Sequence, residues 1–149
     1  MKKNIYNIIT EVIEDYISND DGIKAVLFDF DFTLVNTIAF KGIDKEYIRA
    51  TDDISVVEDL IPQTTVYNGI EELLNYLYTN GIKVGVVSNR LESIVNATLA
   101  HHGIKVDAVV GERPNSTKSN RMGEALNKLG VNPHNAIYVG DSPWDNAEA

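Results

Sequence analysis

The strongest constraint on the fold is a regular alternation between short apolar runs and longer segments whose apolar residues recur at helical spacing. Unbroken apolar runs are typical of strands that are buried on both faces of a parallel sheet. Strands that alternate with helices predict an α/β fold, with right-handed crossovers and helices on the sheet. The expected core strands are 24–28, 83–87, 106–110 and 136–139, and the expected helices are 5–17, 70–78, 91–101 and 122–129.

The length and composition predict a single domain. The chain has 149 residues, of which 44% are hydrophobic, and this is enough for one moderate core. The N-terminal helix is assigned to residues 1–22, because the segment 19–22 ends the helical pattern with Asn, Asp and Gly. From 38 to 66 the pattern becomes polar and only weakly periodic. We therefore expect residues 1–149 to form one domain that carries a small insert.

The charge and the missing cysteines exclude several classes of function. The net charge of -9 and the pI near 4.7 argue against a general binder of nucleic acid or of an anionic membrane. Without cysteine there is no disulfide, no thiolate metal site and no cysteine nucleophile. The first residues lack the apolar core of a signal peptide, and no apolar run is long enough to cross a bilayer. We expect a cytoplasmic protein.

Polar residues follow three of the four expected strands, at the point where each strand ends. Because the carboxyl ends of parallel strands share one edge of the sheet, these side chains should converge on one cleft. Carboxylates gathered there would repel one another without a cation, and Mg²⁺ is the ion that prefers such oxygen ligands. The residues concerned are Asp29 with Asp31, Ser88 with Asn89, and Asp141 with Asp145.

The same residue types are also common in turns and helix caps. Aspartate frequently begins a turn or caps a helix, which is an alternative role for the first pair. Asn89 is followed by Glu92 at the spacing of a capping box, and Ser142 is followed by a proline at a first helical position. These alternatives do not account for Asp141 and Asp145 together.

From about residue 24 to its end, the chain resembles a haloacid dehalogenase superfamily hydrolase of the type related to phosphoglycolate phosphatases. The motifs that carry the resemblance are DFDFT at 29–33, VGVVSN at 84–89 and VGDSPWD at 139–145. The resemblance implies a three-layer, Rossmann-like fold. It also implies an Asp29 nucleophile that forms an aspartyl-phosphate, and Asp31 as general acid and base.

The resemblance further implies a magnesium site and a phosphate site. Asp29, the main-chain carbonyl of Asp31, and Asp141 would hold Mg²⁺, with Asp145 supporting them. Thr33, Ser88 and Asn89 would bind the substrate phosphate, for which a helix start near Ser88 is suitable.

The family also requires a lysine, and its position in this chain is less well defined. Lys118 is the candidate, but the loop RPNSTKSNR has no proline after it, unlike related phosphatases. Arg113 and Arg121 are alternatives, and a solvated basic loop is another. Phe32 replaces the glycine that often stands between the second acid and the threonine, and we interpret it as tuning the pocket.

Several further positions carry weaker expectations. His101 and His102 end a helix, where a cationic side chain interacts favourably with the helix dipole. A capping role is therefore favoured over metal binding for these residues. Lys45 and Arg49 in the insert are expected on a solvated helix face, with substrate contact as the alternative.

The insert is too short for the large helical cap of many relatives, which implies a more open site. That could suit a larger substrate or a lid supplied by a partner protein, although a phosphorylated small molecule is the expected substrate. Relatives continue beyond residue 149 into a helix and a fifth strand, so the final edge strand is expected to be absent. The exposed sheet edge would then suit a homodimer.

The leading hypothesis is an Mg²⁺-dependent phosphatase that hydrolyses a phosphate monoester. The competing hypothesis is a catalytically weak or truncated domain that binds phosphate or regulates a partner. A phosphomutase is a third option, but a small cap excludes water poorly from an aspartyl-phosphate.

Overall fold

The computed structural model describes residues 7, 11, 22–113 and 120–140. Within these residues the core is a parallel sheet with the strand order β5-β4-β1-β6. The strands are β1 (Ala25–Asp29), β4 (Lys83–Leu91), β5 (Ala108–Glu112) and β6 (Ala136–Val139). The four expected core strands are therefore present, and the predicted α/β fold class is confirmed.

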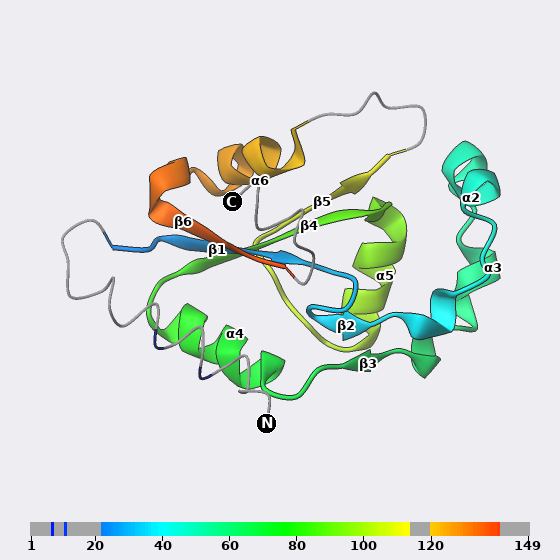
Figure 1. Ribbon diagram of the computed structural model, residues 1–149, viewed down its shortest axis with the longest axis horizontal. Coiled ribbons are helices and arrows are strands. Elements are labelled where there is room, and N and C mark those ends of the chain that lie inside the picture. Colours follow the sequence, from blue (N-terminus) through cyan, green and yellow to red (C-terminus); the bar gives the residue numbers. More distant parts are fainter. Residues whose placement is uncertain (1–6, 8–10, 12–21, 114–119, 141–149) are drawn as a thin grey trace.

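Helices cover both faces of the sheet and produce three layers. The helices α4 (Ile70–Thr79) and α5 (Glu92–His101) lie on one face, and α6 (Arg121–Leu129) lies on the other, as Figure 1 shows. The alternation of side chains along β1 connects the layers: Val26 and Phe28 belong to the apolar cluster under α4 and α5, whereas Leu27 belongs to the cluster under α6.

The insert consists of short elements that follow β1. They are β2 (Val35–Asn36), η1 (Ile38–Phe40), α2 (Lys45–Thr51), α3 (Ser55–Glu58), η2 (Ile61–Gln63) and β3 (Thr65–Val66). β2 and β3 pair antiparallel, and this pairing closes the base of the insert. An apolar cluster that includes Phe40, Ile48 and Val57 also contains Leu91 and Ile94, so the insert packs directly on the start of α5.

The structure corrects the expected end of the second core strand. β4 continues to Leu91, so Ser88 and Asn89 lie within an extended segment and α5 begins only at Glu92. The capping box is therefore wrong: the N-cap residue is Leu91, and Glu92 accepts a hydrogen bond from the Gly111 backbone N–H at 3.1 Å. A Cβ at Gly111 would lie 2.7 Å from Glu92 Cα, so glycine permits this close contact.

Other boundaries shift by one or two residues. β5 begins at Ala108 rather than at 106, because Val106 packs on the apolar core without joining the ladder. A short 3-10 helix, η3 (Pro133–Asn135), leads into β6. The expected helix at 5–17 falls largely outside the described residues, of which 7 and 11 are helical. In the described part of the chain, no helix combines the length and the apolar character needed to cross a membrane.

Candidate active site

The two acids of the first motif lie at the carboxyl end of the central strand β1. Asp29 is the last residue of β1, and its Oδ1 accepts a hydrogen bond from the Phe30 N–H at 2.8 Å. The chain then turns tightly: the Phe30 carbonyl accepts bonds from the N–H groups of Leu34 and Val35 at 3.2 and 3.3 Å. This turn places Asp31 beside the strand end, where ligands bind in open α/β sheets.

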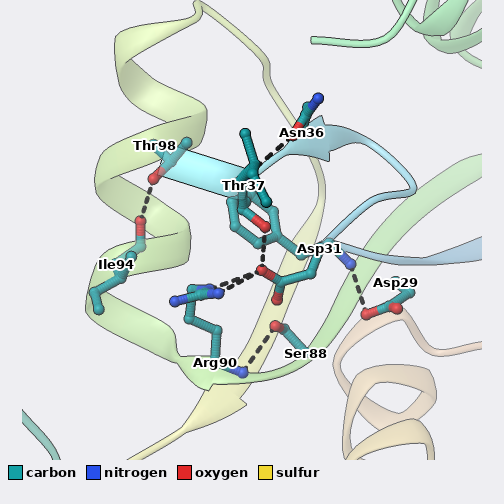
Figure 2. A network of polar contacts seen from close by, with 10 residues as sticks. Asp29, Asp31, Asn36, Thr37, Ser88, Arg90, Ile94 and Thr98 are labelled. Carbon is teal, nitrogen blue, oxygen red and sulfur yellow. Dashed lines mark hydrogen bonds and ion pairs between the residues drawn. The ribbon is translucent and has the colours of Figure 1, made fainter. Parts of the chain in front are cut away.

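Asp31 is fixed by a network of polar contacts (Figure 2). Its Oδ1 accepts hydrogen bonds from Thr37 Oγ1 at 2.6 Å and from Arg90 Nε at 2.9 Å, and Arg90 Nη2 lies 2.7 Å away. The Arg90 side chain is only 16% exposed, and its guanidinium lies 5.0 Å from the centroid of the Phe40 ring. All of these contacts with Asp31 use one carboxylate oxygen.

Arg90 is a site residue that the sequence interpretation missed. It lies two residues after Ser88, in the irregular part of β4 between Val87 and Leu91, and its guanidinium contacts Asp31. A strand period of two would not have identified Arg90, because the register of β4 shifts between Val87 and Leu91.

Hydroxyl groups of Ser88 and Thr33 are buried near the same strand ends. Ser88 follows Val87, which pairs with Asp29, and its Oγ accepts a hydrogen bond from the Arg90 N–H at 3.0 Å. Thr33 Oγ1 is buried and has no hydrogen-bond partner among the residues that the structure describes. A buried hydroxyl without a partner is uncommon, and a bound oxyanion would satisfy it.

The candidate cations differ in what they contact. Arg113 forms ion pairs with Glu92 at 3.2 Å and Glu124 at 3.0 Å, and these carboxylates raise the pKa of Arg113. Arg121 instead donates from Nη1 to Asn89 Oδ1 at 2.7 Å, next to the second motif. Arg113 thus holds α5 and α6 together, whereas Arg121 lies beside a predicted substrate residue.

Part of the predicted site lies outside the described residues, namely Lys118, Asp141 and Asp145. β6 ends at Val139, which pairs with Phe28, so the third motif begins beside the first. Over 22–113 and 120–140, no three acidic or histidine side chains gather into a group that could hold a metal ion. The complete magnesium set remains a prediction.

A cavity of about 420 Å³ lies between the insert and the start of α5. Its apolar lining consists of Phe32, Ile43, Ile48, Leu91 and Ile94. Its polar lining consists of Asp31, Lys45, Arg49, Asn89, Arg90 and Glu112. Lys45 and Arg49 are exposed, as expected, but the face they occupy borders this cavity. Because Asp31 also lines it, the cavity borders one of the candidate catalytic residues.

His102 connects α5 to the insert. Its Nε2 lies 2.8 Å from Thr64 Oγ1, a hydroxyl that also donates to the Ile61 carbonyl at 2.6 Å. Burial lowers the pKa of His102, and the neighbouring His101 lowers it further. The neutral form is therefore favoured at His102, which is the C-cap residue of α5, while His101 is the basic residue of the last turn, as expected.

Comparison with known proteins gives a consistent assignment. The family model described as haloacid dehalogenase-like hydrolase matches residues 41–149, which is more than half of the chain. The chain belongs to the haloacid dehalogenase-like hydrolase family. The predicted family and its hydrolase class are thereby confirmed.

The relatives with curated names are phosphatases. Pyrophosphatase PpaX of Bacillus pumilus is 25% identical over 172 positions, which cover 85% of this chain and 78% of the relative. Phosphoglycolate phosphatase of Rhodospirillum rubrum is 34% identical over 96 residues, covering 61% of this chain and 40% of the relative. Since the first alignment is longer than the 149-residue chain, PpaX has segments that the chain lacks.

A solved structure supports both the fold and the enzyme class. It is a phospho-aspartyl intermediate analogue of phosphoserine phosphatase, with a TM-score of 0.58 and 25% identity. The match covers 85% of this chain and 81% of the phosphoserine phosphatase chain. Together with the curated relatives, it identifies the protein as a phosphatase-type hydrolase of the haloacid dehalogenase family.

Proposed function

We propose that the protein is an Mg²⁺-dependent phosphatase that hydrolyses a phosphate monoester through an aspartyl-phosphate on Asp29. The observation that carries the proposal is the pair of acids at the end of β1, with Asp31 fixed by Arg90 and Thr37 beside a cavity. The matched phosphoserine phosphatase structure, an analogue of a phospho-aspartyl intermediate, supports the same chemistry.

In the first step, an Asp29 carboxylate oxygen attacks the phosphorus atom, and the bond from phosphorus to the leaving-group oxygen breaks. Asp31 donates a proton to that oxygen, so the alcohol leaves in neutral form. A covalent intermediate divides one difficult displacement into two easier ones. General acid catalysis of this kind typically contributes about 10² to 10⁴-fold.

In the second step, Asp31 removes a proton from a water molecule that attacks the phosphorus atom. The bond between phosphorus and Asp29 then breaks, which releases phosphate, restores the Asp29 carboxylate and leaves Asp31 protonated, as it was at the start of the cycle. Arg90 is a positioning residue here, because it holds Oδ1 of Asp31 and leaves Oδ2 without a hydrogen bond inside the described part of the chain. Oδ2 is therefore the oxygen suited to carry the proton.

The phosphate group would contact the hydroxyls of Thr33 and Ser88 and the side chain of Asn89. Thr33 Oγ1 supports this assignment, because it has no hydrogen-bond partner among the described residues and a phosphate oxygen would supply one. Lys118 would balance negative charge in the transition state. Arg121 is the alternative cation, supported by its contact with Asn89.

The donor set suits Mg²⁺, because carboxylate and carbonyl oxygens are the ligands that this ion prefers. Asp29, the carbonyl of Asp31, Asp141 and Asp145 would hold it. When bound, the ion would neutralise charge on the phosphate oxygens and keep the carboxylates from repelling one another.

The substrate is proposed to be a phosphorylated small molecule, and the insert at 38–66 is proposed to act as a small cap within a single domain. Cytoplasmic location and a homodimer formed through an exposed sheet edge remain proposals. The phosphatases among the relatives favour catalysis over a phosphate-binding or regulatory module.

Hydrolysis of p-nitrophenyl phosphate tests the proposal. We expect turnover that requires Mg²⁺, stops with a chelator and is lost in Asp29→Asn. Circular dichroism must show that the variant is folded. A folded wild-type protein that hydrolyses neither this ester nor a panel of natural phosphate esters would support the binding-module alternative.

A further inference from the structure

Phe32 has a backbone conformation that its side chain disfavours. Its φ is 60°, in the left-handed region, where bulky side chains crowd the backbone. Among the described residues Asp52 is the other non-glycine residue with positive φ, but it is the C-cap of α2, where aspartate tolerates this geometry. Phenylalanine, unlike aspartate, does not readily tolerate a positive φ, and glycine would adopt the turn without strain.

Packing in the core does not compensate for this strain. The Phe32 side chain is 45% exposed, whereas the neighbouring Phe28 and Phe30 are completely buried. Phe32 is instead one of the residues that line the cavity. The turn imposes this conformation, since the Phe32 N–H donates to the Val35 carbonyl at 2.8 Å, and strained residues of this kind cluster at functional sites.

The position of the ring relative to Asp31 defines what it would contact. Asp31 and Phe32 are consecutive and line the same cavity. Because Asp31 is the proposed proton donor to the leaving-group oxygen, the group bonded to that oxygen lies in the cavity beside Phe32. Ile43, Ile48 and Ile94 extend the same lining with aliphatic side chains.

The charges around the cavity are largely compensated. Arg90 is paired with Asp31, and Arg49 Nε lies 2.8 Å from Glu112 Oε1. Among the lining residues that the structure describes, Lys45 is the remaining cation, and it is exposed. A site for a second phosphate would need several uncommitted cations, so this lining is better suited to an uncharged, apolar leaving group.

We propose that Phe32 determines substrate specificity, and that the preferred substrate is a phosphate monoester whose leaving group contains an aromatic ring. This proposal rests on the proposed phosphatase function. The ring of the leaving group would pack against Phe32 and the aliphatic lining, with its ester oxygen next to Asp31. The aromatic contact and the buried apolar area both favour such a substrate over a short polar one.

The test compares benzyl phosphate with ethyl phosphate, two alkyl esters that differ by the ring. In the wild-type protein we expect a higher kcat/KM for benzyl phosphate. Phe32→Ala and Phe32→Gly should each reduce that preference by about tenfold, the effect of losing one good apolar contact, and Phe32→Tyr should retain it. An equal loss on both esters, or no loss on either, would overturn the proposal.

A binding experiment separates this proposal from the phosphatase function. Benzylphosphonate and ethylphosphonate, which are not hydrolysed, are titrated into the wild-type protein and Phe32→Ala with Mg²⁺ present. Tighter binding of benzylphosphonate that disappears in the variant supports the role of Phe32 even if no ester is turned over. Equal binding of the two phosphonates to the wild-type protein contradicts it.

Discussion

The turn after β1 and the insert face each other across one cavity, but they are built differently. The turn is held mainly by short-range backbone hydrogen bonds, such as those that the Phe30 carbonyl accepts from Leu34 and Val35. The insert depends on contacts distant in sequence, because its apolar cluster includes Leu91 and Ile94 of the core. The comparison teaches that the backbone of the turn is fixed locally, whereas the insert depends on tertiary packing.

Arg90 connects the two regions. It forms an ion pair with Asp31 at 2.7 Å on the turn and lies 5.0 Å from the Phe40 ring of the insert. Thr37, at the beginning of the insert, donates to the same Asp31 oxygen. A change in the packing of the insert should therefore alter the position of Asp31, the proposed general acid.

Truncating one buried phenylalanine in β1, which precedes the turn, and one in the insert gives the largest expected effect. Phe28→Ala in β1 should lower the free energy of unfolding by about 3–5 kcal/mol, because it leaves a cavity in the main core. Phe40→Ala should instead increase hydrogen exchange in residues 38–66 while the amides of β1 and β4 remain protected. If β1 loses protection together with the insert in Phe40→Ala, the two regions unfold as one unit.

Two arginines that line the cavity provide a matched pair with a smaller effect. Arg90→Gln should lower kcat/KM for ethyl phosphate by about 10- to 100-fold, a share of the general acid–base contribution. Its effect on p-nitrophenyl phosphate should be smaller, since that leaving group departs without a proton. Arg49→Gln, which breaks a pair with Glu112, should change kcat/KM by less than about threefold.

Equal losses on the two esters in Arg90→Gln would assign Arg90 a purely structural role. A loss in Arg49→Gln as large as that in Arg90→Gln would show that the insert takes part in the chemistry.

The smallest expected effect concerns pH. Because burial lowers the pKa of His102, the unfolded state takes up its proton at a higher pH than the folded state. The stability associated with neutral His102 is present above pH 6.5 and is lost as the pH falls through the lowered value. Below pH 6.5 the melting temperature should therefore decrease as the pH is lowered. The decrease should be smaller in His102→Gln. If the melting temperatures of the wild-type protein and His102→Gln decreased in parallel as the pH was lowered, this linkage would be contradicted.

The sequence predicted the parts that depend on local patterns. Apolar runs and helical spacing located the sheet and helices, and the strand ends identified Asp29 and Asp31. The sequence did not identify Arg90, because β4 was not expected to continue past Ser88. That continuation depends on a long-range contact, in which Gly111 lets Glu92 approach the neighbouring strand. The cavity was missed for a similar reason, since packing of residues 48 and 57 against 91 and 94 is a long-range contact.

The central claim is that Asp29 forms a covalent bond to phosphorus. The most direct measurement is intact and peptide mass spectrometry of the protein after acid quenching during hydrolysis of a phosphate ester with Mg²⁺. We predict one phosphoryl group on the peptide that contains Asp29, and none in Asp29→Asn. Continued turnover by folded Asp29→Asn, or a phosphoryl group on a different residue, would contradict the account.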